Sequence, residues 1–198
     1  SLLVDDRGAV WVGHFQAGLD YSLYQNGLFR TYAYPPLFNS ANLSIRSFIS
    51  RGQEKVIGSR DGLFYINEAT GMVKSFVKPV LTSDLILTIS FYQGEYYIGT
   101  YGGGMMVLNP ETLSLKYFSQ SDTELFQKGH IFCVKPDTKG NLWIGTSQGL
   151  FNYNGQTKQI KHFTSANSQL PEGNVYEVSF DSTGKGWIAT ETGMCIYD

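Results

Sequence analysis

The chain has 198 residues, of which 15% are aromatic, 16% are charged and 22 are glycine, and its formal net charge is −2. This composition is typical of a sheet-rich globular chain, and it offers no basic surface that would bind the phosphate backbone of nucleic acid. No apolar run approaches the roughly 18 residues that a membrane span needs, so we expect any span to lie outside this chain.

One short phrase recurs five times: an aromatic or aliphatic pair, a small residue, and then a polar turn. The small residue of each copy is, in chain order, Gly13, Gly58, Gly99, Gly145 and Ala189. Successive copies are roughly 41 to 46 residues apart, a period that is typical of repeat architectures. The period therefore predicts that the chain is a set of structural repeats.

The first copy opens on "LLVDD", which we read as the end of a first strand, and an extra residue delays its second glycine to Gly18, so a bulge is expected there. The second and third copies, "KVIGSRDGLFYIN" and "GEYYIGTYGGGMMVLN", keep the pattern more closely. The fourth copy is the clearest, with strands predicted at 131–134, 142–145, 150–153 and 160–163 joined by tight turns. The fifth copy ends in its third strand.

Four short strands without helical periodicity predict an antiparallel sheet in each copy. Such a sheet carries large side chains on both faces and is stable only when a neighbour covers each face, which favours a β-propeller over a solenoid. We expect an all-β propeller fragment of about five four-stranded antiparallel blades, at 1–38, 39–80, 81–124, 125–169 and 170–198. Three blades are expected to be complete and the first and last truncated, as in an open arc of a larger ring; a closed five-bladed ring is the alternative.

A second spacing, D-x-x-G-x-x-W, occurs three times, with its tryptophan at Trp11, Trp143 and Trp187. Each tryptophan lies in the middle of a predicted strand, so we expect all three in the core between blades. Each aspartate lies in a turn, where its side chain is expected to cap backbone groups. Cys133 and Cys195 lie in apolar strands and are expected to be buried free thiols.

The turns between second and third strands differ between copies, and antiparallel connectivity places them on the same face as the links to the next blade. A structural turn tolerates such variety passively, whereas a binding surface requires it. Arg60 would donate to a carboxylate or to hydroxyl groups, Tyr101 would stack on a ligand ring, and Asn42 and Asn174 lie in nearby links. The candidate ligand-binding residues are His14, Gln16, Arg46, Arg60, Asp61, Tyr101, Gln148 and Glu191.

Catalytic and metal-binding patterns are weak. His14, His130 and His162 occur in different copies and at different positions, with no spacing that would gather metal ligands. No nucleophile elbow or phosphate-binding loop is present, and "YGGGMM" is read as a hairpin turn. We therefore predict no catalytic residues, no metal and no cofactor, although catalytic groups gathered from several blades would leave no trace in sequence spacing.

The stretch from Asp137 to Asn154, "DTKGNLWIGTSQGLFNYN", resembles the two-component regulator propeller repeat. The resemblance implies the periplasmic sensor part of a hybrid two-component system, in a ring of about seven blades, which responds to oligosaccharide breakdown products. The histidine kinase would lie outside these residues. Expected partners are an oligosaccharide, further blades, and a second copy of the chain through uncovered blade faces. A propeller enzyme (lyase, glycosidase or quinone-dependent dehydrogenase) and a structural interaction platform are the alternatives.

Overall fold

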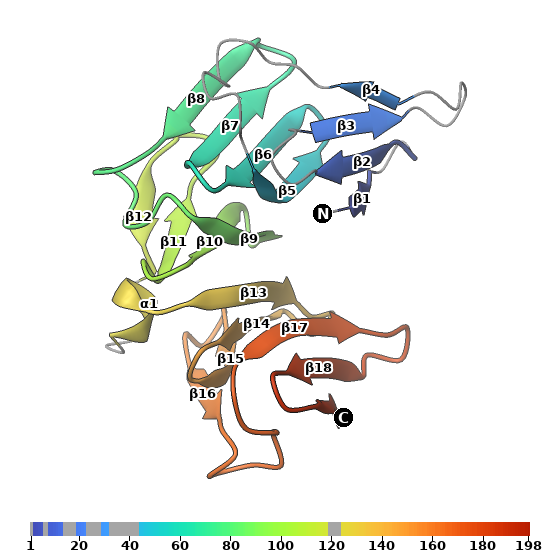
Figure 1. Cartoon of the computed structure of the whole chain (residues 1–198), viewed down its shortest axis with the longest axis vertical. Helices are drawn as coiled ribbons and strands as arrows, with labels where there is room; N and C mark the ends of the chain where they lie inside the picture. The colour runs from blue at the N-terminus through green and yellow to red at the C-terminus, as the bar shows by residue number, and fades with distance from the viewer. Residues whose placement is uncertain (1, 6–7, 14–18, 23–28, 32–43, 119–123) are drawn as a thin grey trace. The chain divides into compact units, whose positions relative to one another are not determined.

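The structure, a computed structural model, describes residues 2–5, 8–13, 19–22, 29–31, 44–118 and 124–198. Within that part of the chain it contains five antiparallel sheets, four of four strands and one of three, each made of consecutive strands (Figure 1). The predicted all-β fold and the number of sheets are thus confirmed. The chain divides into two compact units, Ser1–Ile89 and Ser90–Asp198, and the boundary falls inside the ninth strand.

The first unit holds two sheets, each in the simple order of its strands. The strands of the first sheet are β1 (Leu2–Val4), β2 (Val10–Gly13), β3 (Leu19–Ser22) and β4 (Phe29–Thr31). Those of the second are β5 (Ile45–Arg51), β6 (Glu54–Ser59), β7 (Leu63–Asn67) and β8 (Met72–Phe76). β1 has three residues where β5 has seven, which agrees with the expected short first strand.

The second unit begins within the sheet of β9 (Ile86–Tyr92), β10 (Glu95–Thr100), β11 (Met105–Leu108) and β12 (Leu115–Tyr117). Its next sheet consists of β13 (Ile131–Pro136), β14 (Asn141–Thr146), β15 (Gly149–Asn154) and β16 (Ile160–Phe163). Its last sheet has three strands, β17 (Val175–Phe180), β18 (Gly186–Thr190) and β19 (Met194–Tyr197). The strands of the fourth repeat agree with the sequence prediction to within two residues at each end.

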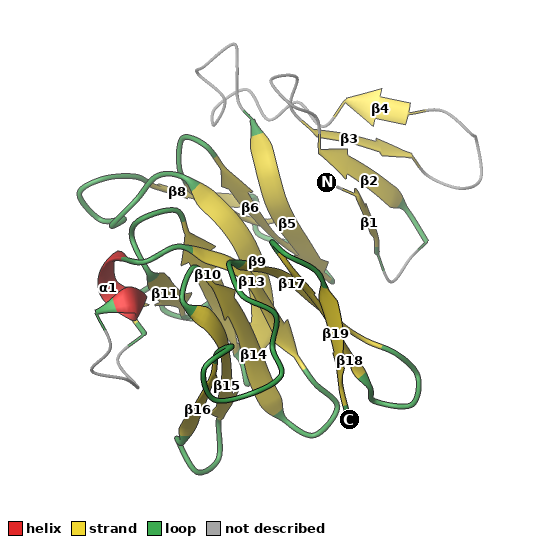
Figure 2. Cartoon of the chain, turned by 60° about the horizontal axis from the view of Figure 1, so that its bottom comes forward, coloured by secondary structure: helices red, strands yellow, loops and turns green. Residues whose placement is uncertain are grey.

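One helical turn, α1 (Leu125–Lys128), was not predicted (Figure 2). Four residues are too few to show a helical period in the sequence, and tertiary packing stabilises such a short helix. Phe126 is fully buried, and its ring lies 5.2 Å from the rings of both Phe118 and Phe151. The position that faces this helical turn must be a glycine, Gly104, because a β-carbon there would collide with the Phe126 carbonyl. In the described part of the chain, no helix has the length and apolar character that a membrane crossing demands.

The repeated glycine marks the place where the second strand of one sheet approaches the first strand of the next. A β-carbon on Gly145 would lie 2.6 Å from the carbonyl oxygen of Val175 and 2.5 Å from the sulfur of Cys133. In the first unit, a β-carbon on Gly58 would collide with the side chain of Ile86. The sheets therefore pack so closely at this position that they exclude a side chain, which explains why the glycine recurs with the repeat.

An aspartate in the turn after the first strand holds the tryptophan of the second strand. The indole N–H donates to a carboxylate oxygen in three sheets: Trp11 to Asp5 at 2.9 Å, Trp143 to Asp137 at 2.9 Å, and Trp187 to Asp181 at 3.2 Å. The other oxygen of each aspartate accepts backbone N–H groups of the same turn, as expected for a capping aspartate. The carboxylate thus fixes the turn and the ring together; its bond to the indole was not predicted.

The tryptophans are not all in the core. Trp11 and Trp143 are each 3% exposed, as predicted, but Trp187 is 39% exposed. Phe180 and Tyr197 of the following sheet cover Trp143, at ring centroid distances of 6.1 and 4.7 Å. Within the described part of the second unit no sheet packs over the face of β17–β19 that carries Trp187, and the predicted burial of this side chain is wrong for this chain. Cys195 is likewise only half-buried, whereas Cys133 is buried as predicted.

We expect acid to destabilise the second unit through these aspartates. Burial alone raises the pKa of Asp137, but hydrogen bonds from Asn141 and Trp143 outweigh it and leave the pKa below its ordinary value of 3.8. Hydrogen bonds from Thr183 and Trp187 lower the pKa of Asp181 to about 2. A carboxyl whose pKa is lower in the folded state stabilises the fold above its unfolded pKa, and this stabilisation is lost between about pH 4 and pH 2.

The measurement is the free energy of unfolding in urea at successive pH values. The asparagine of Asp137→Asn has one acceptor oxygen where the aspartate has two. We therefore expect its free energy of unfolding to be lower by about 1–3 kcal/mol at neutral pH. The same variant should respond less to acid than the parent chain. Equal acid sensitivity in the parent and the variant would show that Asp137 is not the group responsible.

Candidate ligand-binding site

The turns that join second and third strands share a hydroxyl latch. In the fourth repeat the hydroxyl of Thr146 donates to the carbonyl of Gly149 at 2.8 Å and accepts the N–H of Gln148 at 3.0 Å. Ser59, Thr100 and Thr190 make the corresponding bond to the carbonyl of a glycine, at distances of 3.0, 2.9 and 2.9 Å. Because the latch uses backbone groups of the turn, it holds the loop rigid whatever side chains lie between its ends.

Three of these turns are also tied to the residue that precedes the first strand of the same sheet. Ser147 donates its N–H to the carbonyl of His130 at 3.2 Å, and Glu191 donates to the carbonyl of Asn174 at 2.9 Å. In the first unit Arg60 donates to the carbonyl of Ser44 at 3.0 Å. In these three sheets the turn and the start of the first strand therefore lie at the same edge, as the connectivity predicted.

The first strands carry a β-bulge at the same position of three repeats. The register shifts between Ile45 and Ser47, between Ile131 and Cys133, and between Val175 and Glu177. The bulged residues are Arg46, Phe132 and Tyr176. A bulge re-aims the side chain that it carries and is common beside binding sites. Arg46 was a predicted site residue; Phe132 and Tyr176, its equivalents in later repeats, were missed.

Four aromatic side chains of the second unit lie in sequence along this edge, and we call them the aromatic row: Tyr101, His130, Phe132 and Tyr176. The rings of Tyr101 and His130 are stacked, with centroids 4.0 Å apart and planes inclined by 25°. Phe132 lies 6.2 Å from His130 and meets the ring of Tyr176 edge-on at 5.1 Å. Tyr101 is 50% exposed and Tyr176 is 43% exposed, so the row presents aromatic surface to solvent.

Polar groups border the aromatic row. Asn174 donates from its side chain to the hydroxyl of Tyr176 at 3.1 Å, and its N–H lies 3.4 Å from a carboxylate oxygen of Glu191. A groove of about 300 Å³ begins beside it, lined by Gln148 and Asn174 among others. The Nδ1 atom of His130 is buried and has no hydrogen-bond partner among the described residues. A buried polar atom without a partner destabilises the free protein.

The structure places the predicted site residues at two separate edges, and some of them lie outside the described part of the chain. Tyr101, Gln148 and Glu191 are exposed at the edge of the second unit that also carries the aromatic row. Arg46, Arg60 and Asp61 are exposed at the corresponding edge of the second sheet of the first unit. His14, Gln16 and Asn42 lie outside the described residues, as does the bulge expected in the first repeat. Whether any of these side chains contacts a ligand stays a prediction.

Catalytic chemistry finds little support in the arrangement. His162 is held by the carbonyl of Gln148 at 2.7 Å, and its ring stacks on Phe151 at 4.0 Å. Across the part of the chain that the structure describes, no three histidine, cysteine or acidic side chains are grouped as metal ligands would be. Burial raises the pKa of the Cys133 thiol to about 12, so that sulfur is inert at neutral pH.

The five sheets, with their repeated glycines and tryptophans, define the class: this is a β-propeller fold. The WD40 β-propeller domain of Doa1 aligns over 100% of the chain with a TM-score of 0.69 at 12% identity, covering 62% of that domain. Residues 126–148 match the family described as "Two component regulator propeller", which confirms the resemblance found in the fourth repeat. No curated protein sequence matches the chain.

Two ectodomains from B. thetaiotaomicron are similar over the whole chain. One is the extracellular domain of BT3049, a protein described as a hybrid two component system, with 27% identity and a TM-score of 0.74. The other is the extracellular domain of BT4673, with the same description, 19% identity and a TM-score of 0.67. Both alignments cover 100% of this chain but only 26% and 31% of those domains. The chain thus spans about a quarter to a third of the ectodomains that it matches.

Proposed function

We propose that the chain is part of the periplasmic, ligand-sensing propeller module of a hybrid two-component sensor. The module would bind oligosaccharide breakdown products and signal to a histidine kinase outside these 198 residues. The similarity to an extracellular domain of such a system supports the class of protein. The aromatic row supports ligand binding, and it is the observation on which the proposal depends.

The chemistry of the aromatic row suits a saccharide. A sugar ring has an apolar face of C–H groups that packs on an exposed aromatic ring, and hydroxyl groups at its rim that need both donors and acceptors. Tyr101 and Tyr176 supply the exposed rings. Asn174 and Glu191 supply a donor and an acceptor beside Tyr176, and the unpartnered Nδ1 of His130 lies beneath Tyr101.

Signalling would follow from a difference in affinity between two arrangements of the module. A ligand shifts a conformational equilibrium only by as much as it prefers one state. The rigid latch at each turn would transmit the position of the ligand to the sheets, and further blades and domains would read it out. Separately, the exposed side chains of Trp187, Met194 and Ile196 support the expectation that the isolated chain associates with itself.

A panel of oligosaccharides tests the proposed site by thermal shift, followed by calorimetry for any compound that stabilises the chain. We expect the double variant Tyr101→Ala/Tyr176→Ala to bind roughly tenfold more weakly, because each exposed ring contributes about 0.5–1.5 kcal/mol beyond its buried area. The matched control is Tyr117→Ala: Tyr117 is also 50% exposed in the second unit but lies on β12, away from the aromatic row.

A turnover assay on every stabilising compound separates a sensor from an enzyme. We expect stabilisation without product. Product formation by the parent chain would replace the sensor proposal by a propeller enzyme, and equal losses of affinity in the double variant and in Tyr117→Ala would remove the aromatic row from the site.

A further inference from the structure

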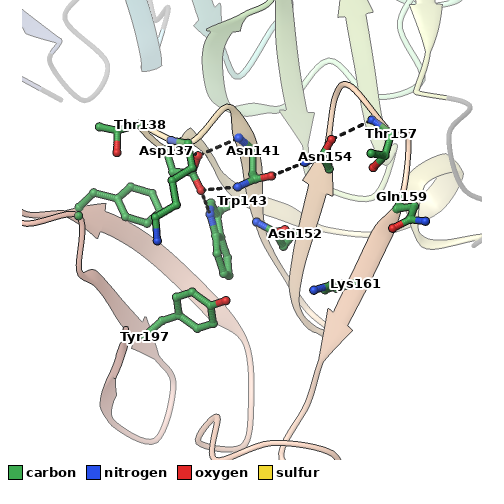
Figure 3. Close-up of a pocket in the computed structure, with 13 residues that line it drawn as sticks. Asp137, Thr138, Asn141, Trp143, Asn152, Asn154, Thr157, Gln159, Lys161 and Tyr197 are labelled. Atoms are coloured by element: carbon green, nitrogen blue, oxygen red, sulfur yellow. Dashed lines mark hydrogen bonds between the residues drawn. The ribbon is translucent and has the colours of Figure 1, made fainter.

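A second cavity of the second unit lies at the opposite end of the strands from the aromatic row. It has a volume of about 270 Å³ and lies between the sheet of β13–β16 and the sheet of β17–β19 (Figure 3). Trp143, Asn152 and Lys161 form one cross-strand row on its first wall. Phe180 and Tyr197 line it from the other sheet. Ligand pockets commonly have about 300–1,000 Å³, so this one suits a single ring.

Asn152 is a polar residue at a position of the repeat where the other sheets have an aromatic or aliphatic residue. It pairs directly with the tryptophan of the second strand, and the residues that pair at the corresponding position of the other four sheets are Tyr21, Tyr65, Val107 and Ile196. Only the fourth repeat has an amide there. Its Nδ2 atom is buried and has no hydrogen-bond partner in the described part of the chain. A buried donor without an acceptor destabilises the free protein, which an apolar residue would avoid.

Lys161 is the neighbour of Asn152 on β16 and supplies a positive charge. Basic residues recur at this position, at Arg30, Lys74 and Lys116, and Lys116 forms an ion pair with Glu95 at 3.1 Å. Lys161 forms no ion pair with any carboxylate that the structure describes. The nearby carboxylate of Asp137 already accepts hydrogen bonds from backbone N–H groups of its own turn and from the side chains of Asn141 and Trp143. Asp137 lines the same cavity, but neither the Lys161 ammonium nor the Nδ2 atom of Asn152 bonds to it or to another acceptor of the described residues.

We propose that this cavity binds the carboxylate of a small acidic sugar, a hexuronic acid. The amide of Asn152 and the ammonium of Lys161 would both donate to the carboxylate, an arrangement stronger than a neutral hydrogen bond. Figure 3 shows both nitrogen atoms turned to the side on which Trp143 and Tyr197 lie. The ring of Tyr197, which is 39% exposed and rests edge-on against the buried Trp143 at 4.7 Å, would pack against the sugar ring. The site is independent of the aromatic row and of the proposed sensor function.

Calorimetry of the 198-residue chain with glucuronate, galacturonate and glucose tests the site. For a single ring we expect a dissociation constant on the order of 1 mM for one of the two uronates, and at least tenfold weaker binding of glucose. Lys161→Gln should weaken uronate binding at least tenfold without changing the melting temperature. Asn152→Val should abolish binding and raise the melting temperature, because it removes the unsatisfied donor.

Lys74→Gln is the matched control, since Lys74 occupies the same position of the repeat in the first unit and should leave binding unchanged. A role of Asn152 in folding alone would lower the melting temperature of Asn152→Val and leave uronate affinity intact, and that result would overturn the proposal. It would equally be overturned if neither uronate bound at concentrations well above the expected dissociation constant, or if glucose bound as tightly as they do.

Discussion

Replacing Trp143 with alanine is expected to destabilise the second unit by about 3–5 kcal/mol, the usual cost of removing a buried tryptophan. The indole is 3% exposed and contacts Phe163, Phe180 and Tyr197. The substitution opens a cavity between two sheets and also leaves Asp137 without the indole donor. Urea denaturation followed by far-UV circular dichroism measures the loss, because that signal comes mainly from the backbone of the sheets.

Trp187→Ala is the matched control for this prediction. Trp187 has the same bond to an aspartate and the same position in its repeat, but it is 39% exposed. We expect a smaller loss in the free energy of unfolding, about 1–2 kcal/mol, because less of the Trp187 side chain is buried than of Trp143. A cost for Trp187→Ala as large as that for Trp143→Ala would mean that the tryptophan acts within its own sheet and not as a contact to the next one.

Gly145→Ala is expected to destabilise the chain by about 1–3 kcal/mol, although alanine is otherwise the mildest substitution for glycine. The new methyl group would meet the carbonyl oxygen of Val175, which belongs to the backbone and cannot rotate away. Relief therefore requires the two sheets to separate. The free energy of unfolding in urea is again the measurement.

Gly193→Ala provides the control, because no atom lies within 4 Å of a β-carbon added there. Its effect should stay within about 0.5 kcal/mol. If both alanines are tolerated equally, the close approach of the sheets at Gly145 does not explain the period of the repeat.

The sequence was sufficient to predict those parts of the fold that every repeat needs. The glycine at Gly145 and the tryptophan at Trp143 recur because each sheet must cover its neighbour in the same way. Their spacing therefore predicts the sheets, their strand order and the turns between them. The capping role of Asp137 was also predicted from its position, because an aspartate in a turn commonly accepts hydrogen bonds from the backbone N–H groups that follow it.

Features that occur once were harder to predict. The α1 turn depends on the burial of Phe126 against two other rings, which no local pattern reveals. The exposure of Trp187 depends on what covers its sheet. Phe132 and Tyr176 in the aromatic row were missed because each occupies a strand, and the bulges that turn them outward are visible only in the pairing register. Aligning the repeats at this position would have placed both beside Arg46.

The hydroxyl latch separates the shape of each turn from the identity of its side chains. Thr146 and its equivalents bond to main-chain groups, so the loop keeps its shape when the side chains between the ends of the latch are exchanged. In the proposed sensor, recognition and folding would be encoded by different atoms of the same turn. New specificities would then arise by one or two substitutions in each loop, without a compensating change elsewhere in the sheet.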